Sequence, residues 1–102
     1  MNITDFNAAI EAQLDRCKSI LVQKQGEYAP SVDKLHNFHN AASLQGVTTM
    51  QACGGFMAKH IISIFDMISM ADAEIHIDTW NEKITDAINY LLILRAIIED
   101  DA

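Results

Sequence analysis

Apolar side chains recur every three or four residues along most of the chain, which is the spacing of helices that bury one face. The clearest stretch runs from Asp78 to Ile98. It is polar in its first half and almost wholly apolar in its second, so we expect its second half to be enclosed by other helices. Similar patterns cover Thr4 or Asp5 to about Gln25, Lys34 to Gln45, and Thr48 to about Ala71. No stretch alternates convincingly as a strand does. The chain therefore predicts an all-α fold, an antiparallel four-helix bundle with three long helices and one short one.

Residues with known preferences for helix ends support these boundaries. Thr48 with Gln51, and Thr79 with Glu82, have the three-residue spacing of a capping box. Gly26 and Gly46 stand where the first two helices should end, since glycine accepts the left-handed backbone that often follows a helix.

Polar residues on the last helix share one stripe. Glu82, Asp86 and Asn89 stand at i, i+4 and i+7, and the next residue along this stripe is Ile93. A polar line that runs into an apolar face is the arrangement expected at the mouth of a pocket. A buried amide such as that of Asn89 needs partners, because leaving it unpaired costs about 1–3 kcal/mol.

Two carboxylates one helical turn apart can hold Mg²⁺, which prefers oxygen ligands and accepts substrate phosphates and water as the rest. The same residues also fit a purely structural role. Glu82 would then complete the cap, Asp86 would be solvated near the positive end of the helix, and Asn89 would pack between helices.

Composition narrows the class of protein. The chain has 102 residues and a net charge of −7, without a run of Lys or Arg, which argues against a nucleic-acid polymer as partner. No apolar run approaches the roughly 20 residues of a membrane span, and the first residues do not resemble a signal peptide. Cys17 and Cys53 are typical of free thiols in the cytoplasm. Half of the residues are apolar, so we expect one domain whose surface closes against another subunit, as a homodimer or higher homo-oligomer.

Histidines suggest a metal only weakly. His36 and His39 stand three residues apart, which is close enough to share a zinc ion, but no cysteine or second histidine pair completes such a set. Partly buried or surface histidines are the expectation.

Several motifs together resemble a known family. The segment EKITDAINYLLIL resembles the second acidic helix of the MazG-like all-α nucleoside triphosphate pyrophosphohydrolases. Small phage-encoded proteins related to that group, associated with nucleotide modification, are closer still. The segments similar to theirs are Lys24-Gln25-Gly26-Glu27-Tyr28, Asp86-Ala87-Ile88-Asn89-Tyr90, KLHNFHNAASLQG and GFMAKHIISIFDM.

The resemblance implies an enzyme that hydrolyses a nucleoside triphosphate to the monophosphate and pyrophosphate with Mg²⁺. It places Glu82 and Asp86 as catalytic metal ligands, with Asp78 as a third ligand. It assigns the nucleotide to Lys59, His60, Asn89, Tyr28 and Glu27.

The chain departs from the family at two points. The helix before the acidic one lacks the ExxE pair of these enzymes, and Lys83 stands where a second glutamate is common. The alternative is therefore a non-catalytic helical module that binds a nucleotide or a protein.

Overall fold

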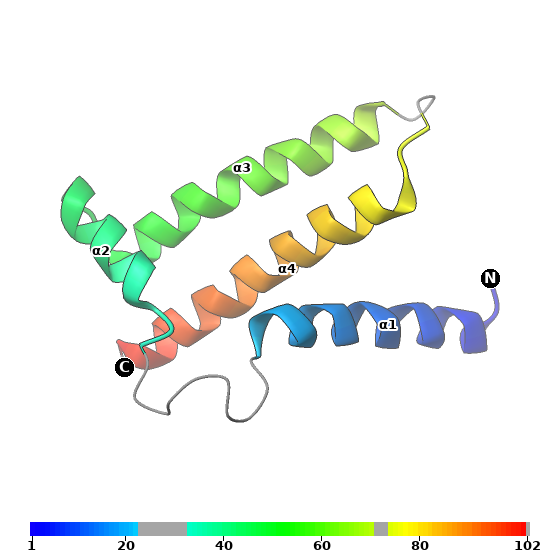
Figure 1. Ribbon diagram of the computed structural model, residues 1–102, viewed down its shortest axis with the longest axis horizontal. Helices are drawn as coiled ribbons and strands as arrows, with labels where there is room; N and C mark the ends of the chain where they lie inside the picture. The colour runs from blue at the N-terminus through cyan, green and yellow to red at the C-terminus, as the bar shows by residue number, and fades with distance from the viewer. Residues whose placement is uncertain (23–32, 71–73, 102) are drawn as a thin grey trace.

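The computed structural model describes residues 1–22, 33–70 and 74–101, and this part of the chain folds into helices alone. They are α1 (Ile3–Leu21), α2 (His36–Gln45), α3 (Thr49–Ser69) and α4 (Ile77–Asp100). The prediction of an all-α fold with three long helices and one short one is confirmed (Figure 1). None of the described helices is long and apolar enough to cross a membrane.

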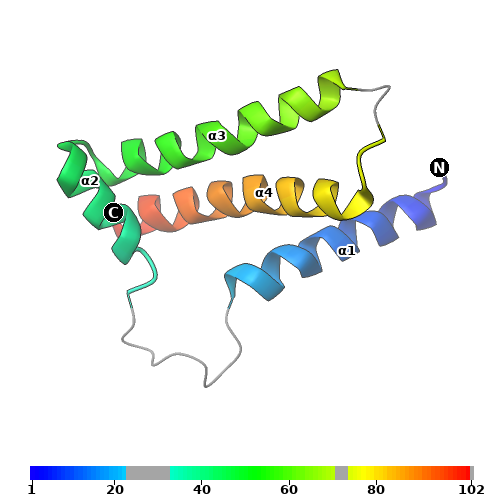
Figure 2. The same ribbon diagram turned by 45° about the horizontal axis from the view of Figure 1, so that its top comes forward.

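The long helix α4 lies between α1 and α3 (Figures 1 and 2). α3 and α4 pack antiparallel, as predicted, and the short α2 packs against the beginning of α3. By contrast, α1 runs parallel to α4. Their polar contacts show this direction, because Gln13 pairs with Thr85 and, one turn further along both helices, Cys17 pairs with Asn89.

Two predicted helix ends are confirmed. Thr48 and Gln51 form a capping box, in which the Gln51 N–H donates to Thr48 Oγ1 (3.1 Å) and the Thr48 N–H donates to Gln51 Oε1 (2.9 Å). Gly46 ends α2 with φ of 67°, the left-handed conformation in which glycine is favoured. Gly26 lies outside the described residues.

Other predicted caps are wrong. Thr79 lies inside α4, because His76 caps this helix instead through its Nδ1, which accepts from the Asp78 N–H at 3.1 Å. Asn2 caps α1 in place of Thr4 or Asp5, accepting from the Asp5 N–H at 2.8 Å. In each case an earlier side chain can satisfy the free N–H groups of the first turn, so the helix starts earlier.

The extents of the first two helices also differ from the prediction. α1 ends at Leu21, with Val22 extended after it, and the predicted end, Gln25, lies outside the described residues. α2 begins at His36 instead of Lys34. Before α2, the Asp33 carboxylate accepts from the Leu35 N–H at 2.9 Å, so Asp33 organises the turn ahead of the helix and does not cap it.

The buried core is small. Its apolar members are Cys17, Ala42, Ala52, Cys53, Met67, Ala87 and Ile97. The expectation that the second half of α4 is enclosed is wrong for this chain alone, since Leu91, Leu92 and Ile98 are exposed. The reason is geometric: α4 has α1 on one side and α3 on the other, and these two helices leave Leu91, Leu92 and Ile98 uncovered.

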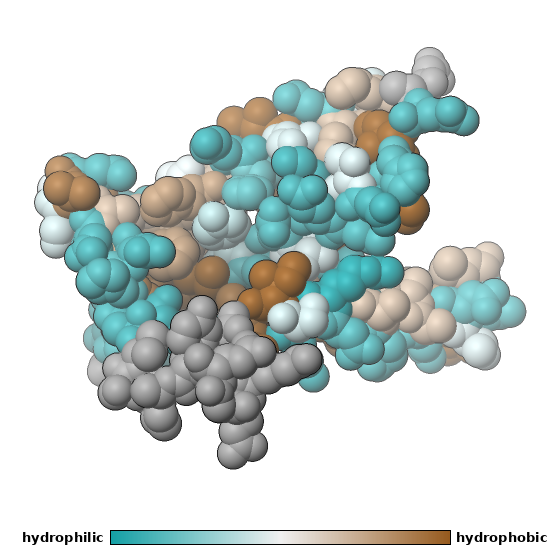
Figure 3. Space-filling model, viewed as in Figure 1, coloured by the Kyte–Doolittle hydropathy of each residue, from teal (hydrophilic) through white to brown (hydrophobic). Residues whose placement is uncertain are grey.

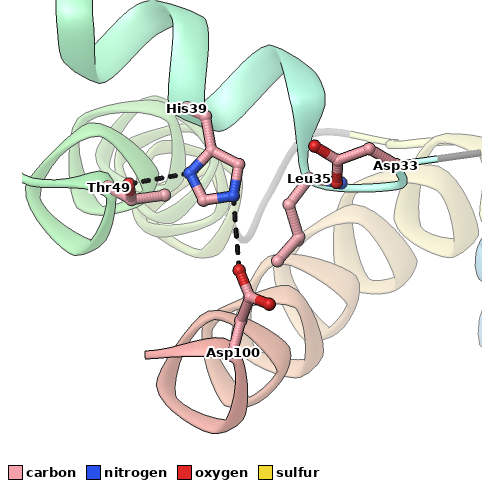
Figure 4. Close-up of polar contacts among 5 residues, drawn as sticks. All are labelled: Asp33, Leu35, His39, Thr49 and Asp100. Atoms are coloured by element: carbon pink, nitrogen blue, oxygen red, sulfur yellow. Dashed lines mark hydrogen bonds and ion pairs between the residues drawn. The ribbon is translucent and has the colours of Figure 1, made fainter. Parts of the chain in front are cut away.

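Aromatic and polar contacts hold α2 in place. The Phe38 ring stands edge-on to Phe56 of α3 at 5.7 Å and to Tyr90 of α4 at 6.3 Å between ring centroids. His39 contacts Thr49 Oγ1 through Nδ1 (3.0 Å) and Asp100 Oδ2 through Nε2 (3.4 Å), so it joins α2 to the start of α3 and the end of α4 (Figure 4). His36 instead contacts Asn40.

Replacement of Ile97 by alanine should destabilise the fold because its side chain is fully buried between the helices. We expect Ile97→Ala to lower the free energy of unfolding by about 3 kcal/mol. The matched control, Ile98→Ala, removes the same atoms from a side chain that is 40% exposed and should cost less than about 1 kcal/mol. Urea unfolding followed by circular dichroism measures both. Equal losses in the two variants would contradict this packing.

The buried thiol of Cys53 should make stability fall at alkaline pH. Burial raises the pKa of this thiol above its ordinary value of 9.0. The unfolded chain therefore loses the proton first, and the stability present below the unfolded pKa is lost as pH rises through the folded one. We expect Cys53→Ala to show a smaller loss of unfolding free energy between about pH 8 and 10 than the wild type. An identical loss in both proteins would contradict it.

Candidate functional site

A cavity of about 470 Å³ opens where the end of α1, the beginning of α2 and the middle of α4 meet, with one residue added by α3. Small-molecule sites in proteins commonly measure about 300–1,000 Å³. The described residues that line it are Ile20, Leu21, Lys34, Leu35, His60, Asp86, Asn89, Tyr90, Leu92, Ile93 and Ala96. The cavity is therefore built from parts of the chain that lie far apart in the sequence.

The lining reproduces the stripe predicted on the last helix. Asp86, Asn89 and Ile93 all face the cavity, so one wall changes from polar to apolar along α4. Leu21 and Leu35 add apolar surface from the other two helices. Such a lining can hold an apolar or aromatic ring on one side and a polar or charged group on the other.

Two titratable side chains stand together on the polar wall. His60 Nδ1 lies 3.9 Å from Asp86 Oδ2, and both side chains are partly exposed. This separation exceeds that of a hydrogen bond, so the Asp86 carboxylate keeps its capacity to accept other partners. The His60 ring also lies against Tyr90, with 4.8 Å between ring centroids and 35° between ring planes. The two rings fix the orientation of the histidine beside the carboxylate.

Asn89 is the unusual residue of the cavity wall. It is only 6% exposed, and its Nδ2 donates a long hydrogen bond (3.5 Å) to the Cys17 carbonyl of α1. Its Oδ1 is buried and has no hydrogen-bond partner within the described part of the chain. Thr85, one turn earlier, is satisfied, because Gln13 donates to its Oγ1 at 2.8 Å. An unpaired buried carbonyl costs about 1–3 kcal/mol, so a residue retained at this cost is a candidate for function.

Other predicted site residues do not reach the cavity. Glu82 and Asp78 are exposed, and Asp78 lies 3.4 Å from His76 at the beginning of α4. Lys59 neighbours His60 in sequence but lines a separate hollow of about 290 Å³ with Gln45, Ala52, Gly55 and Phe56. Adjacent residues of a helix point about 100° apart, which explains why Lys59 and His60 separate. Glu27 and Tyr28 lie outside the described residues.

The donor set suits one kind of magnesium site. Across the described ranges, no group of three His, Cys, Asp or Glu side chains is close enough to hold a metal ion. Asp86 and Glu82, one turn apart on α4, are a two-carboxylate set. Such a set fits a Mg²⁺ ion that arrives with a phosphate ligand and keeps several waters, and it does not fit an all-protein cage.

Lys34 is a lining residue that the sequence did not suggest. It stands at the turn before α2 and is the only Lys or Arg among the described residues of the cavity wall. Lys34 is far in sequence from the acidic helix, so the sequence does not indicate that the two lie close together. The contacts of α2 with α3 and α4, such as those of Phe38 with Phe56 and Tyr90, bring the preceding turn to the cavity.

Comparisons of the chain with protein-family models, with curated proteins and with solved structures find no match. The functional assignment therefore depends on the geometry of the cavity and on the chemistry of its side chains.

Because the Asn89 carbonyl has no hydrogen-bond partner in the described part of the chain, its removal should not destabilise the protein. Asn89→Leu removes the buried carbonyl at similar volume and loses only the long hydrogen bond to Cys17. We expect the variant to be as stable as the wild type or more stable by about 1 kcal/mol, as measured by urea unfolding. Thr85→Val is the control: it breaks the short contact with Gln13 and should lower stability by about 1 kcal/mol. A strong destabilisation by Asn89→Leu would show that the amide is a structural group.

Proposed function

We propose that the cavity binds a nucleoside triphosphate together with Mg²⁺ and that the chain hydrolyses it to the monophosphate and pyrophosphate. One observation carries this proposal: Asp86, Asn89 and His60 line a cavity of about 470 Å³ whose other walls are largely apolar. The resemblance of EKITDAINYLLIL to the MazG-like pyrophosphohydrolases supports the same reaction.

In this proposal each wall has its own task. The apolar side chains Leu21, Leu35 and Ile93 take the flat faces of the base and exclude water from it. Asn89 hydrogen-bonds the base or sugar, which would give its amide the partner it lacks in the described chain. The Asn89 carbonyl is closed to solvent, so this contact requires the side chain to turn towards the cavity.

The charged groups would handle the phosphates. Asp86 holds the ion from the cavity wall, and Glu82 adds a carboxylate from one turn nearer the helix start. Bound Mg²⁺ would neutralise phosphate charge and lower the pKa of a water molecule that attacks phosphorus. Lys34 offers positive charge at the same cavity and takes the role expected of Lys59, which faces the other hollow. His60, which lies 3.9 Å from Asp86, would accept a proton from this water.

A second candidate is a module that binds a nucleotide and does not hydrolyse it. The exposure of Glu82 and Asp78, and the lack of a three-ligand group among the described residues, favour this candidate. It uses the same cavity and the same Asn89, but it assigns the two acids to the solvated start of α4. Catalysis and binding must therefore be measured separately.

Replacement of Asp86 by asparagine distinguishes the two candidates. For the enzyme, Asp86→Asn should lower Mg²⁺-dependent pyrophosphate release from a panel of triphosphates by on the order of 100-fold, with the fold intact. Asp66→Asn is the control, because Asp66 is an exposed acid on α3 outside the cavity. Release of pyrophosphate and calorimetric binding are followed with and without Mg²⁺.

The outcomes separate clearly. Nucleotide binding without turnover in the wild type would favour the non-catalytic module. If the wild type neither binds nor hydrolyses any triphosphate, both candidate functions are contradicted.

A further inference from the structure

Among the described residues, one buried side-chain atom has no hydrogen-bond partner, and this atom is an acceptor, Oδ1 of Asn89. The Asn89 amide nitrogen faces the backbone carbonyl of Cys17 at 3.5 Å. A backbone carbonyl can only accept, so the nitrogen is the only end of the amide that can face it. The reverse orientation would set two carbonyl oxygens against each other. The contact with Cys17 therefore leaves the oxygen of Asn89, and not its nitrogen, for a ligand.

The same contact limits how Asn89 can meet a ligand. Its side chain lines the cavity, but its oxygen is closed to solvent. A turn of the amide that keeps the nitrogen on Cys17 carries the oxygen towards the cavity. A turn that offers the nitrogen instead loses the bond to Cys17 and leaves the oxygen still unpaired. A ligand is therefore bound best when it donates a hydrogen bond to this oxygen.

The position of this acceptor selects donors that project from a ring. Asn89 is only 6% exposed, so its oxygen stays recessed in the cavity wall. An exocyclic amino group, as on adenine or cytosine, extends beyond the ring and can reach a recessed acceptor. The ring N–H of uracil lies between two carbonyl oxygens, and that of hypoxanthine lies beside one. These oxygens extend further than the N–H, so they would meet the Asn89 oxygen first and repel it.

The rest of the cavity suits a flat ring. Where the end of α1 lies beside α4, Figure 3 shows apolar side chains next to polar ones. Leu21 and Leu35 line the cavity from outside α4, and Ile93 follows Asn89 by one turn on the same helix. A ring packed between these apolar side chains would present its edge, and not its face, to the Asn89 amide.

We propose that the Asn89 carbonyl makes the cavity selective for a base with an exocyclic amino group, such as cytosine or adenine, over the matched base with a carbonyl group at that position. This selectivity rests on the proposed function, because it takes the ligand to be a nucleoside triphosphate. A hydroxyl of the sugar is the other projecting donor of a nucleotide. The base is favoured because the apolar side chains beside Asn89 suit a ring and cannot pair with the remaining oxygens of a sugar.

Binding of matched nucleotide pairs tests the selectivity. The α,β-methylene analogues of CTP, UTP, ATP and ITP keep the phosphates but cannot release pyrophosphate, so calorimetry with Mg²⁺ measures their binding alone. CTP is paired with UTP, and ATP with ITP. Within each pair that binds, the amino member should bind on the order of 10-fold more tightly than the carbonyl member. Asn89→Leu should abolish this difference.

Asn81→Leu is the matched control. It makes the same exchange on α4, at a partly exposed position that is not among the described residues of the cavity lining. This variant should keep the wild-type preference. Circular dichroism checks that both variants remain helical.

Three results would overturn the selectivity. One is equal affinity within the pairs, which leaves the proposed function standing where the triphosphates themselves are hydrolysed. Another is a preference that persists in Asn89→Leu, because a different residue would then select the base. The third is a loss of affinity for the dideoxy form of the CTP analogue without any preference within the pairs, which would assign Asn89 to a sugar hydroxyl. If no nucleotide binds at all, the proposed function itself fails, and the selectivity with it.

Discussion

The position of α4 between two neighbours of different character is the constraint on which this fold depends. Towards α3, α4 makes the His60–Asp86 contact at 3.9 Å and a ring contact between Tyr90 and His60, and the Cys53 thiol of α3 lies 3.7 Å from the Tyr90 carbonyl. Towards α1, the buried residues of α4 are Thr85 and Asn89, which are polar. α4 therefore packs on both sides, and on the second side, towards α1, the Asn89 carbonyl has no hydrogen-bond partner among the described residues. The cavity lies at the second side, where α1 ends.

This division connects stability with function at Asn89. The Asn89 carbonyl, which has no hydrogen-bond partner among the described residues, weakens the contact between α1 and α4, and the same residue lines the cavity. Proteins often retain polar groups at binding sites at the expense of stability. The surroundings of Asn89 agree with that rule, since the other buried polar side chain of the contact, Thr85, is paired at short distance. The difference between two residues one turn apart makes Asn89 the strongest candidate for a functional role among the described residues.

The sequence predicts the elements of this protein better than their surroundings. Helix number and class follow from periodicity, and the start of α3 and the end of α2 follow from Thr48 and Gly46. The stripe of Asp86, Asn89 and Ile93 is also readable, since helical spacing alone puts these residues together. The position of Lys34 at the cavity could not be predicted, because it depends on how α2 packs against α3 and α4. The exposure of Leu91 could not be predicted for a similar reason: the apolar composition of a helix indicates that it should be covered, but it does not identify the element that covers it.

Because α1 has few contacts with the rest of the described chain, it should detach locally before the other helices unfold. Within the described chain, α1 touches only α4, and one of the two polar links between them is long. Units with few buried contacts open before the rest of a protein unfolds. Ile20 and Leu21 of α1 form part of the cavity wall, so each such opening would also widen the cavity. The rate at which a small molecule enters or leaves would then depend on the rate at which α1 detaches.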